Sequence, residues 1–200
     1  MNIREPEIRR PYRMDARAEA AEATRVRIVE TARKLWWDCY YDEVSLQEIA
    51  DGAGVSLQTV IRRFGSKDGL LVAVSQHISP GVMAERDAVP PGDIDAIVGH
   101  LVPHYEEMGD PMLRLQSLED RLPAVKEALR LPRAMHREWL ARTFAKFLPD
   151  PQSPEYNWRI AMFASAVDLH TWQVLRREQG LSVDETARAM REMLERLTRR

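Results

Sequence analysis

The stretch from Val44 to Leu71, VSLQEIADGAGVSLQTVIRRFGSKDGLL, constrains the fold more than any other part of the chain. Its apolar residues recur at helical spacing, stop at residues 52–55, and resume after Ser56, which has the residue type of an N-cap. Gly54 can take the positive φ that a tight turn needs. The pattern therefore predicts a helix, a tight turn and a second helix, with a third helix opening near Ser66. In such helix-turn-helix units the second helix enters the DNA major groove.

The overall composition is that of a soluble globular protein. The chain has 200 residues, of which 44% are hydrophobic and 30% charged, enough for one or two domains with a sizeable core. No apolar run approaches the ~20 residues of a membrane span, and residues 1–17 lack the apolar core of a secretory signal. The single cysteine, Cys39, cannot form an internal disulfide, which fits a reducing cytosol. We therefore expect a cytoplasmic protein.

The charges are unevenly distributed along the chain. The formal net charge of −2 does not by itself indicate a nucleic-acid binder. However, residues 1–34 carry nine Lys/Arg against six Asp/Glu, residues 35–60 carry five acids and no Lys or Arg, and residues 61–67 carry three Lys/Arg and no acid. Phosphate-neutralising groups are therefore placed on both sides of the second motif helix in sequence.

The rest of the chain is predicted to be helical, because no segment shows strand-like alternation over more than a few residues. We expect a flexible Arg-rich arm at residues 1–15, a helix-turn-helix domain at 16–70 and a larger helical domain at 71–200. Residues 89–93, VPPGD, are the clearest boundary between the compact N-terminal part and the longer C-terminal part. Outside the motif, one helix is expected to start near residue 66 and to end at a break at residues 79–81 or somewhat later. The other expected helices span about residues 16–39, 94–108, 111–121, 123–131, 132–148, 155–179 and 183–198.

The last two predicted helices carry more apolar surface than one packing face requires. Residues 183–198 show a narrow seam at 4-3-4-3 spacing, made of Val183, Ala187, Met190, Leu194 and Leu197. Residues 155–179 are apolar on two sides, one starting at Ile160 and the other at Trp158. One side can pack on its own chain and the other on a second copy, which would make a four-helix interface in a homodimer. Alternatively, residues 94–150 cover both sides within one monomer.

Over about residues 24–71 the chain resembles the tetracycline-repressor (TetR) family of bacterial transcription regulators. The matching residues are Ile28, Ala32, Leu35, Val44, Ser45, Leu46, Ile49, Ala50, Ala53, Gly54, Val55, Ser56, Thr59, Val60, Phe64, Ser66, Lys67, Asp68, Gly69, Leu70 and Leu71. The resemblance implies an all-helical, Ω-shaped homodimer that binds double-stranded DNA at a palindromic operator through its N-terminal domains. It further implies a small-molecule pocket in the larger domains, dimerisation through the last two helices, and release of DNA when the ligand binds.

Two positions depart from the family pattern. Ile61 stands where the family commonly has a tyrosine whose hydroxyl reaches a DNA phosphate. Without the tyrosine hydroxyl, a phosphate contact of about 1 kcal/mol is lost, and Arg62 or Arg63 could provide a contact in its place. Gln58 stands where glycine or another small residue is common, and its amide can read an adenine edge.

The expected DNA contacts divide into those that position the protein and those that specify bases. Positioning is assigned to the hydroxyls of Ser45 and Thr59, to Lys67, and to helix N-terminal amides near Ser45 and Ser66. Base reading is assigned to Leu57, Gln58 and Arg62, with Ser56 and Arg63 as further candidates. In the arm, Arg9, Arg10 and Arg13 either add phosphate or minor-groove contacts or have no role.

A small, largely apolar effector is expected to bind among residues 94–148 and one face of residues 155–179, because aromatic and Met side chains suit such a ligand. The candidate lining residues are Tyr105, Met108, Leu113, Leu118, Trp139, Phe144, Met162 and Trp172. The alternative for each is an ordinary core position. Pro103 removes a helical N–H and should kink or break its helix, which would either open a cavity or wrap the helix around the core.

Signals for catalysis are weak. His100 and His104 stand four apart and could face one metal, with Glu106 or His136 as a further ligand, but Pro103 disturbs that helix. No phosphate-binding loop or nucleophile elbow is present, and Cys39 ends a predicted buried stripe, so we expect core rather than catalysis there. We expect no catalytic residue, metal or cofactor. The alternative class is a helical small-molecule binder or enzyme that keeps the fold without reading DNA.

Overall fold

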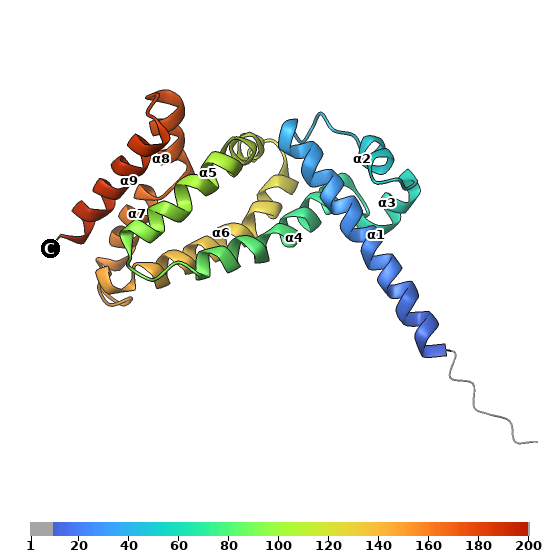
Figure 1. Cartoon of the computed structure of the whole chain (residues 1–200), viewed down its shortest axis with the longest axis horizontal. Coiled ribbons are helices and arrows are strands. Elements are labelled where there is room, and N and C mark those ends of the chain that lie inside the picture. Colours follow the sequence, from blue (N-terminus) through green and yellow to red (C-terminus); the bar gives the residue numbers. More distant parts are fainter. Residues whose placement is uncertain (1–9, 200) are drawn as a thin grey trace, which may run out of the picture. The chain divides into compact units, whose positions relative to one another are not determined.

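The computed structural model describes residues 10–199 of the chain and the side chains of residues 17–199 (Figure 1). Within this part every regular element is helical, so the all-α fold class is confirmed. The described residues divide into two compact units, one ending at Val74 and the other beginning at Ser75. The domain boundary was expected slightly earlier, after residue 70. None of the described helices is both long and apolar enough to cross a lipid bilayer.

The N-terminal unit contains α1 (Arg10–Asp38), α2 (Leu46–Gly52), α3 (Leu57–Phe64) and the first turns of α4 (Lys67–Asp87). Helix α1 begins earlier than expected, because residues 10–15 of the predicted arm are already helical. Pro11 lies in the first turn, where no backbone N–H is required, and the Ala, Arg and Glu residues that follow are good helix formers. Residues 1–9, with Arg9, lie outside the described part of the chain.

Helix α1 packs against α2, and α2 packs against α3, through small and β-branched side chains. The completely buried apolar residues of this unit are Ile28, Val29, Ala32, Ile49, Ala50, Val60 and Leu70. Arg27 Nε donates a hydrogen bond of 2.8 Å to the Ala53 carbonyl, which ties α1 to the turn between α2 and α3. Cys39 is exposed and not part of the core, because α1 ends at Asp38 and the predicted stripe does not extend to it.

The second unit is built from the remainder of α4 and from α5 (Ile94–Gln116), α6 (Pro123–Thr143), the 3-10 turn η1 (Ala145–Phe147), α7 (Tyr156–Ala166), α8 (Leu169–Gln173), the π-helical turn η2 (Val174–Glu178) and α9 (Val183–Thr198). Residues 89–93 form the loop between α4 and α5, so this predicted boundary lies inside the second unit.

The helix breaks predicted at Pro111 and Pro132 are wrong, as is the earlier of the two expected ends of α4. Helix α4 continues through Pro80, α5 through Pro103 and Pro111, and α6 through Pro132. An internal proline costs about 3 kcal/mol, but most helical stability in a folded protein comes from packing of an apolar face. Helix α5 buries apolar residues on both sides of Pro103, so tertiary packing outweighs the local cost.

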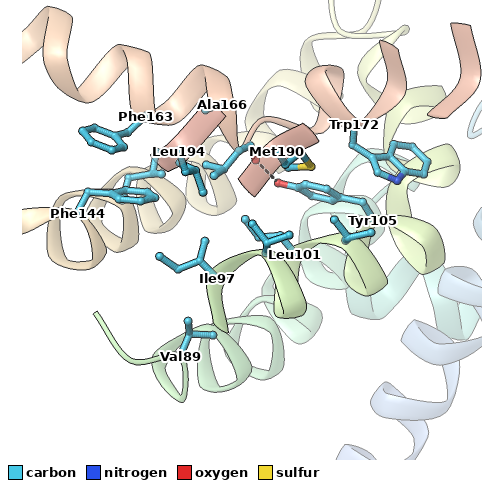
Figure 2. Packing of buried hydrophobic residues seen from close by; sticks show 14 of the residues in the cluster. Val89, Ile97, Leu101, Tyr105, Phe144, Phe163, Ala166, Trp172, Met190 and Leu194 are labelled. Carbon is cyan, nitrogen blue, oxygen red and sulfur yellow. Dashed lines mark hydrogen bonds between the residues drawn. The ribbon is translucent and has the colours of Figure 1, made fainter. Parts of the chain in front are cut away.

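The core of the second unit lies between α5, α6, α7, α8 and α9 and is rich in aromatic rings (Figure 2). Phe144 and Phe163 stack with ring centroids 4.6 Å apart. Met190 and Leu194 from the predicted seam of α9 are completely buried in this core, whereas Val183 at the start of the seam is 40% exposed. The seam of α9 is therefore covered largely by helices of the same chain, since α9 packs on α5 and α7.

The single helix expected over residues 155–179 is interrupted between α7 and α8. Asp168 leaves helical geometry, with φ −75° and ψ 149°, and its carboxylate accepts the His170 N–H at 2.8 Å, which caps α8. The carbonyl of Val167, freed by the interruption, accepts the hydroxyl of Tyr105 at 2.8 Å in the buried core (Figure 2). The carbonyl at the break thus obtains its hydrogen bond from a residue more than sixty positions away in sequence, so hydrophobic periodicity could not predict the interruption.

Candidate nucleic-acid interface

Both helices of the predicted motif begin at serine caps. Ser45 and Glu48 form a capping box, in which the Ser45 hydroxyl accepts the Glu48 N–H at 3.2 Å and the Glu48 carboxylate accepts the Ser45 N–H at 2.7 Å. The Ser45 hydroxyl also donates to the Glu48 carboxylate at 2.7 Å, and this bond, followed by the bond from the Ser45 N–H, lowers the pKa of Glu48. Ser56 caps α3 by accepting the Thr59 N–H at 3.2 Å. The two helix starts are therefore fixed by local hydrogen bonds, as the serine positions predict.

The turn between the two helices is tight and depends on one glycine. Gly54 has φ +63°, as expected. Its neighbour Val55 donates a backbone hydrogen bond of 3.0 Å to the Ala50 carbonyl, and Gly54 N–H donates to the Asp51 carbonyl at 3.1 Å. These bonds close the end of α2 and direct the chain into α3.

Helix α3 has one buried and one open side. Val60 is completely buried and holds α3 against the rest of the unit. Gln58, Ile61 and Arg62 are exposed and recur at spacings of three and four, so they share one helix face. Leu57, Thr59 and Arg63 are half-buried at its margins. The polar and basic side chains predicted to read bases therefore point away from the core.

The start of α4 places a cation beside this motif within the same unit. The Ser66 hydroxyl accepts the Gly69 N–H at 3.1 Å, as expected for an N-cap. Lys67 Nζ lies 4.5 Å from the centroid of the Tyr41 ring, and the Tyr41 hydroxyl donates to Asp68 at 2.6 Å. Partial burial lowers the pKa of Lys67, against the opposing effect of nearby carboxylates. The structure thus orients Lys67 through contacts that sequence reasoning missed, because Tyr41 lies far from it along the chain.

The hydroxyl groups predicted to hold DNA phosphates already have partners in the protein. Ser45 Oγ contacts Glu48, and the Ser56 and Thr59 hydroxyl oxygens lie 3.0 Å apart. Arg63 Nε is buried and has no hydrogen-bond partner. The exposed residues of the predicted set are Ser45, Ser56, Gln58 and Arg62.

The comparisons with known proteins place this unit in a family. Residues 28–74 match the model of the bacterial regulatory proteins of the tetR family. The N-terminal unit is a TetR-family helix-turn-helix domain. Among curated proteins no significant relative was found.

Several solved structures share the fold of this chain. A TetR transcriptional regulator from Rhodococcus sp. RHA1 is 20% identical, with a TM-score of 0.59 over 88% of this chain and 96% of that one. A protein from Mesorhizobium loti MAFF303099 assigned to the same family is 16% identical, with a TM-score of 0.63 over 88% and 96%. A protein from Pseudomonas aeruginosa PAO1 assigned as a transcriptional regulator is 13% identical, with a TM-score of 0.65 over 88% and 91%.

The residues predicted to line an effector pocket do not form one continuous set. Tyr105, Trp139, Phe144 and Trp172 belong to the aromatic core of the second unit, and Leu113 packs against that core. Leu118 is buried and Met108 half-buried, whereas Met162 is 38% exposed. Their role in ligand binding stays a prediction.

The histidines considered as metal ligands lie together in the second unit. The rings of His100 and His104 stack with centroids 5.8 Å apart. Among the described residues, no three His, Cys, Asp or Glu side chains are grouped so that they could hold a metal ion. The charge of a buried arginine, Arg86, helps to lower the pKa of both histidines, after burial, and sequence reasoning did not identify this residue.

Proposed function

We propose that this TetR-family protein is a repressor that binds a palindromic operator as a homodimer and releases it when a small molecule binds the second unit. The observation that supports DNA reading most directly is the open face of α3. Gln58, Ile61 and Arg62 are exposed there, while Val60 is completely buried behind them. A recognition helix needs this arrangement, because only side chains turned away from the core can reach base edges in the major groove.

The residues of this face suit particular base contacts. The amide of Gln58 can bind both the acceptor and the donor on an adenine edge, and the guanidinium of Arg62 can bind two acceptors of a guanine. Ile61 is 38% exposed and is suited to an apolar contact with a thymine methyl group. Leu57 at the margin of this face is suited to the same kind of contact.

Positioning on the DNA backbone is assigned to groups at the helix starts. Lys67 is held over the Tyr41 ring, so less side-chain freedom is lost when its ammonium pairs with a phosphate. The capped N-termini near Ser45 and Ser66 present backbone N–H groups to anions. The Thr59 hydroxyl can donate to a phosphate oxygen while it accepts from Ser56, whereas the Ser45 hydroxyl donates its proton to Glu48 and must exchange that bond to reach a phosphate.

Dimerisation is proposed through residues 155–179 and 183–198. Trp158 and Met162 on α7 are 52% and 38% exposed, and they lie four residues apart on one helix face. Met193 on α9 is 39% exposed. Farther along the same predicted stripe, Leu169 and Trp172 are buried by the chain itself. The second copy is therefore proposed to cover the first half of the stripe, where large apolar side chains remain in water.

Selection of bound fragments from random DNA tests the proposal. The expected result is an enriched inverted repeat, because a two-fold dimer reads two half-sites. The Gln58→Ala variant should select a repeat with relaxed preference at one position of each half-site. Absence of enrichment would contradict DNA reading and favour a protein that keeps the fold for another purpose.

The homodimer is tested separately by sedimentation of the wild type and of a Trp158→Glu/Met162→Glu variant. The wild type should sediment as a dimer and the variant as a monomer with unchanged helical content. A monomeric wild type, or a variant that dimerises equally well, would contradict the proposed interface.

A further inference from the structure

The second unit contains a buried arginine that the fold itself does not neutralise. Arg86, near the end of α4, keeps only 8% of its surface exposed. Within the described part of the chain no Asp or Glu pairs with its guanidinium, and its Nε has no hydrogen-bond partner. A buried charge is strongly disfavoured unless it is paired and hydrogen-bonded. The observation therefore points to a partner that is not part of this chain.

Neighbouring groups from α6 hold this cation in place. Arg86 Nη1 lies 3.0 Å from His136 Nδ1. A guanidinium can only donate, so His136 accepts at Nδ1 and is a neutral ring with its proton on Nε2. The guanidinium carbon lies 5.4 Å from the Trp139 ring centroid, and Trp139 Nε1 donates to the Arg86 carbonyl at 3.1 Å. The position of the charge is thus fixed by an imidazole and an indole.

Helix α5 contributes two further imidazoles to the same cluster. The rings of His100 and His104 stack with centroids 5.8 Å apart, and burial, followed by the charge of Arg86, lowers the pKa of both. His100 Nε2 is buried without a hydrogen-bond partner. The ring of Tyr105 lies 5.8 Å from that of His104. Helices α4 and α6 therefore form a cationic, aromatic cluster around Arg86, and the two imidazoles of α5, one with unused hydrogen-bonding capacity, are coupled to it electrostatically.

We propose that Arg86, His100, His104 and His136 form the effector site and that its ligand is a monocarboxylate with an apolar or aromatic body. A guanidinium binds a carboxylate through two parallel N–H bonds, and imidazole N–H groups can supplement them. One buried positive charge balances one negative charge, so a monoanion fits better than a phosphate dianion. Trp139 and Tyr105 supply apolar surface beside the charge. This inference rests on the proposed effector-responsive function and replaces the largely apolar effector expected from the sequence.

The probes that test it are benzoate, phenylacetate and hexanoate, each compared with its neutral amide, and inorganic phosphate. Because a ligand that binds the folded state stabilises it, unfolding midpoints are measured at constant pH and ionic strength, and calorimetry gives the Kd of any stabilising probe. At least one carboxylate should stabilise the wild type and bind at least tenfold more tightly than its amide. The Arg86→Met variant should lose this response while remaining folded.

Two further variants keep the test decisive. Arg130→Met removes an exposed arginine from α6 and should respond like the wild type. Arg86→Lys keeps the charge without the planar fork and should bind the same carboxylate at least tenfold more weakly, even if Arg86→Met does not fold. The proposal is overturned if no carboxylate acts more strongly than its amide, if phosphate acts as strongly, or if the response survives in the Arg86 variants.

The assay contains no DNA, so its outcome is independent of operator binding. If no carboxylate binds but the protein still binds DNA, the proposed ligand class is wrong and the proposed regulator function stands. Carboxylate binding without any DNA binding would remove the regulator function and leave the site.

Discussion

The histidines around Arg86 should make the second unit sensitive to mild acid. Burial, and then the charge of Arg86, lowers the pKa of His104 and of His136 to about 4. An unfolded histidine titrates near 6.5, so between pH 6.5 and 4 the unfolded chain binds more protons and stability falls as pH falls. The stability that these two neutral, buried histidines contribute is fully present above pH 6.5. At pH 5 each of the two histidines lowers the free energy of unfolding by about 2 kcal/mol relative to pH 7.5, which makes about 4 kcal/mol for the pair.

The assay is urea unfolding at pH 5 and pH 7.5, followed by tryptophan fluorescence. In a Trp36→Phe/Trp37→Phe background the remaining indoles all lie in the second unit, so the signal reports that unit. Glu106 does not obscure the window, because its hydrogen bond to Arg176 lowers its pKa, and its contribution is lost only below the ordinary carboxyl range.

The comparison variant is His104→Gln/His136→Gln, in which neutral amides replace both rings. It should lose a large part of the pH dependence, and each single variant a smaller part, because His100, whose pKa is also lowered by burial, remains in all of them. An equally large loss of stability at pH 5 in the double variant would refute the reasoning, because the protons would then be taken up elsewhere.

Three further substitutions test separate parts of the structure. Gln58→Ala should change preference at one base position by about 1–3 kcal/mol, measured by competition with DNA variants, and an unchanged preference would exclude Gln58 from base reading. Gly69→Ala places a Cβ 2.1 Å from the Phe64 carbonyl oxygen, so it should destabilise the N-terminal unit in urea unfolding. The cost should be about 1–3 kcal/mol, and a neutral effect would contradict that close approach. Tyr105→Phe leaves the Val167 carbonyl without its donor and should cost about 1–3 kcal/mol in the second unit, whereas a smaller loss would show that the helix interruption does not need this bond.

The parts of the fold that could be predicted from sequence depend on local signals. Ser56 as an N-cap, Gly54 with positive φ and the burial of Val60 each follow from residues within one or two helical turns. The last helix was also predicted correctly, because Gly180 and Ser182 mark its start and the seam is periodic. In these places local preference and tertiary structure agree.

The parts that could not be predicted depend on contacts between distant residues. Pro111 and Pro132 suggested breaks, but the surrounding apolar faces keep both helices continuous. The interruption at Asp168 is satisfied by Tyr105 from another helix. Likewise, the cation–π contact of Lys67 with Tyr41 and the pairing of Arg86 with His136 join residues with no recognisable spacing. The open face of α3 could therefore be placed from sequence, whereas the cluster in the second unit required coordinates.

DNA reading by the open face of α3 is best tested by the salt dependence of binding to the selected operator. Four phosphate contacts are enough to lower the affinity about 100-fold between 50 and 200 mM salt. We expect at least this loss for the wild type, and a slope for Lys67→Ala that is flatter by about one unit for each reading head. Binding that is insensitive to salt, or equal for the operator and a scrambled sequence, would contradict the claim that the open face of α3 reads DNA.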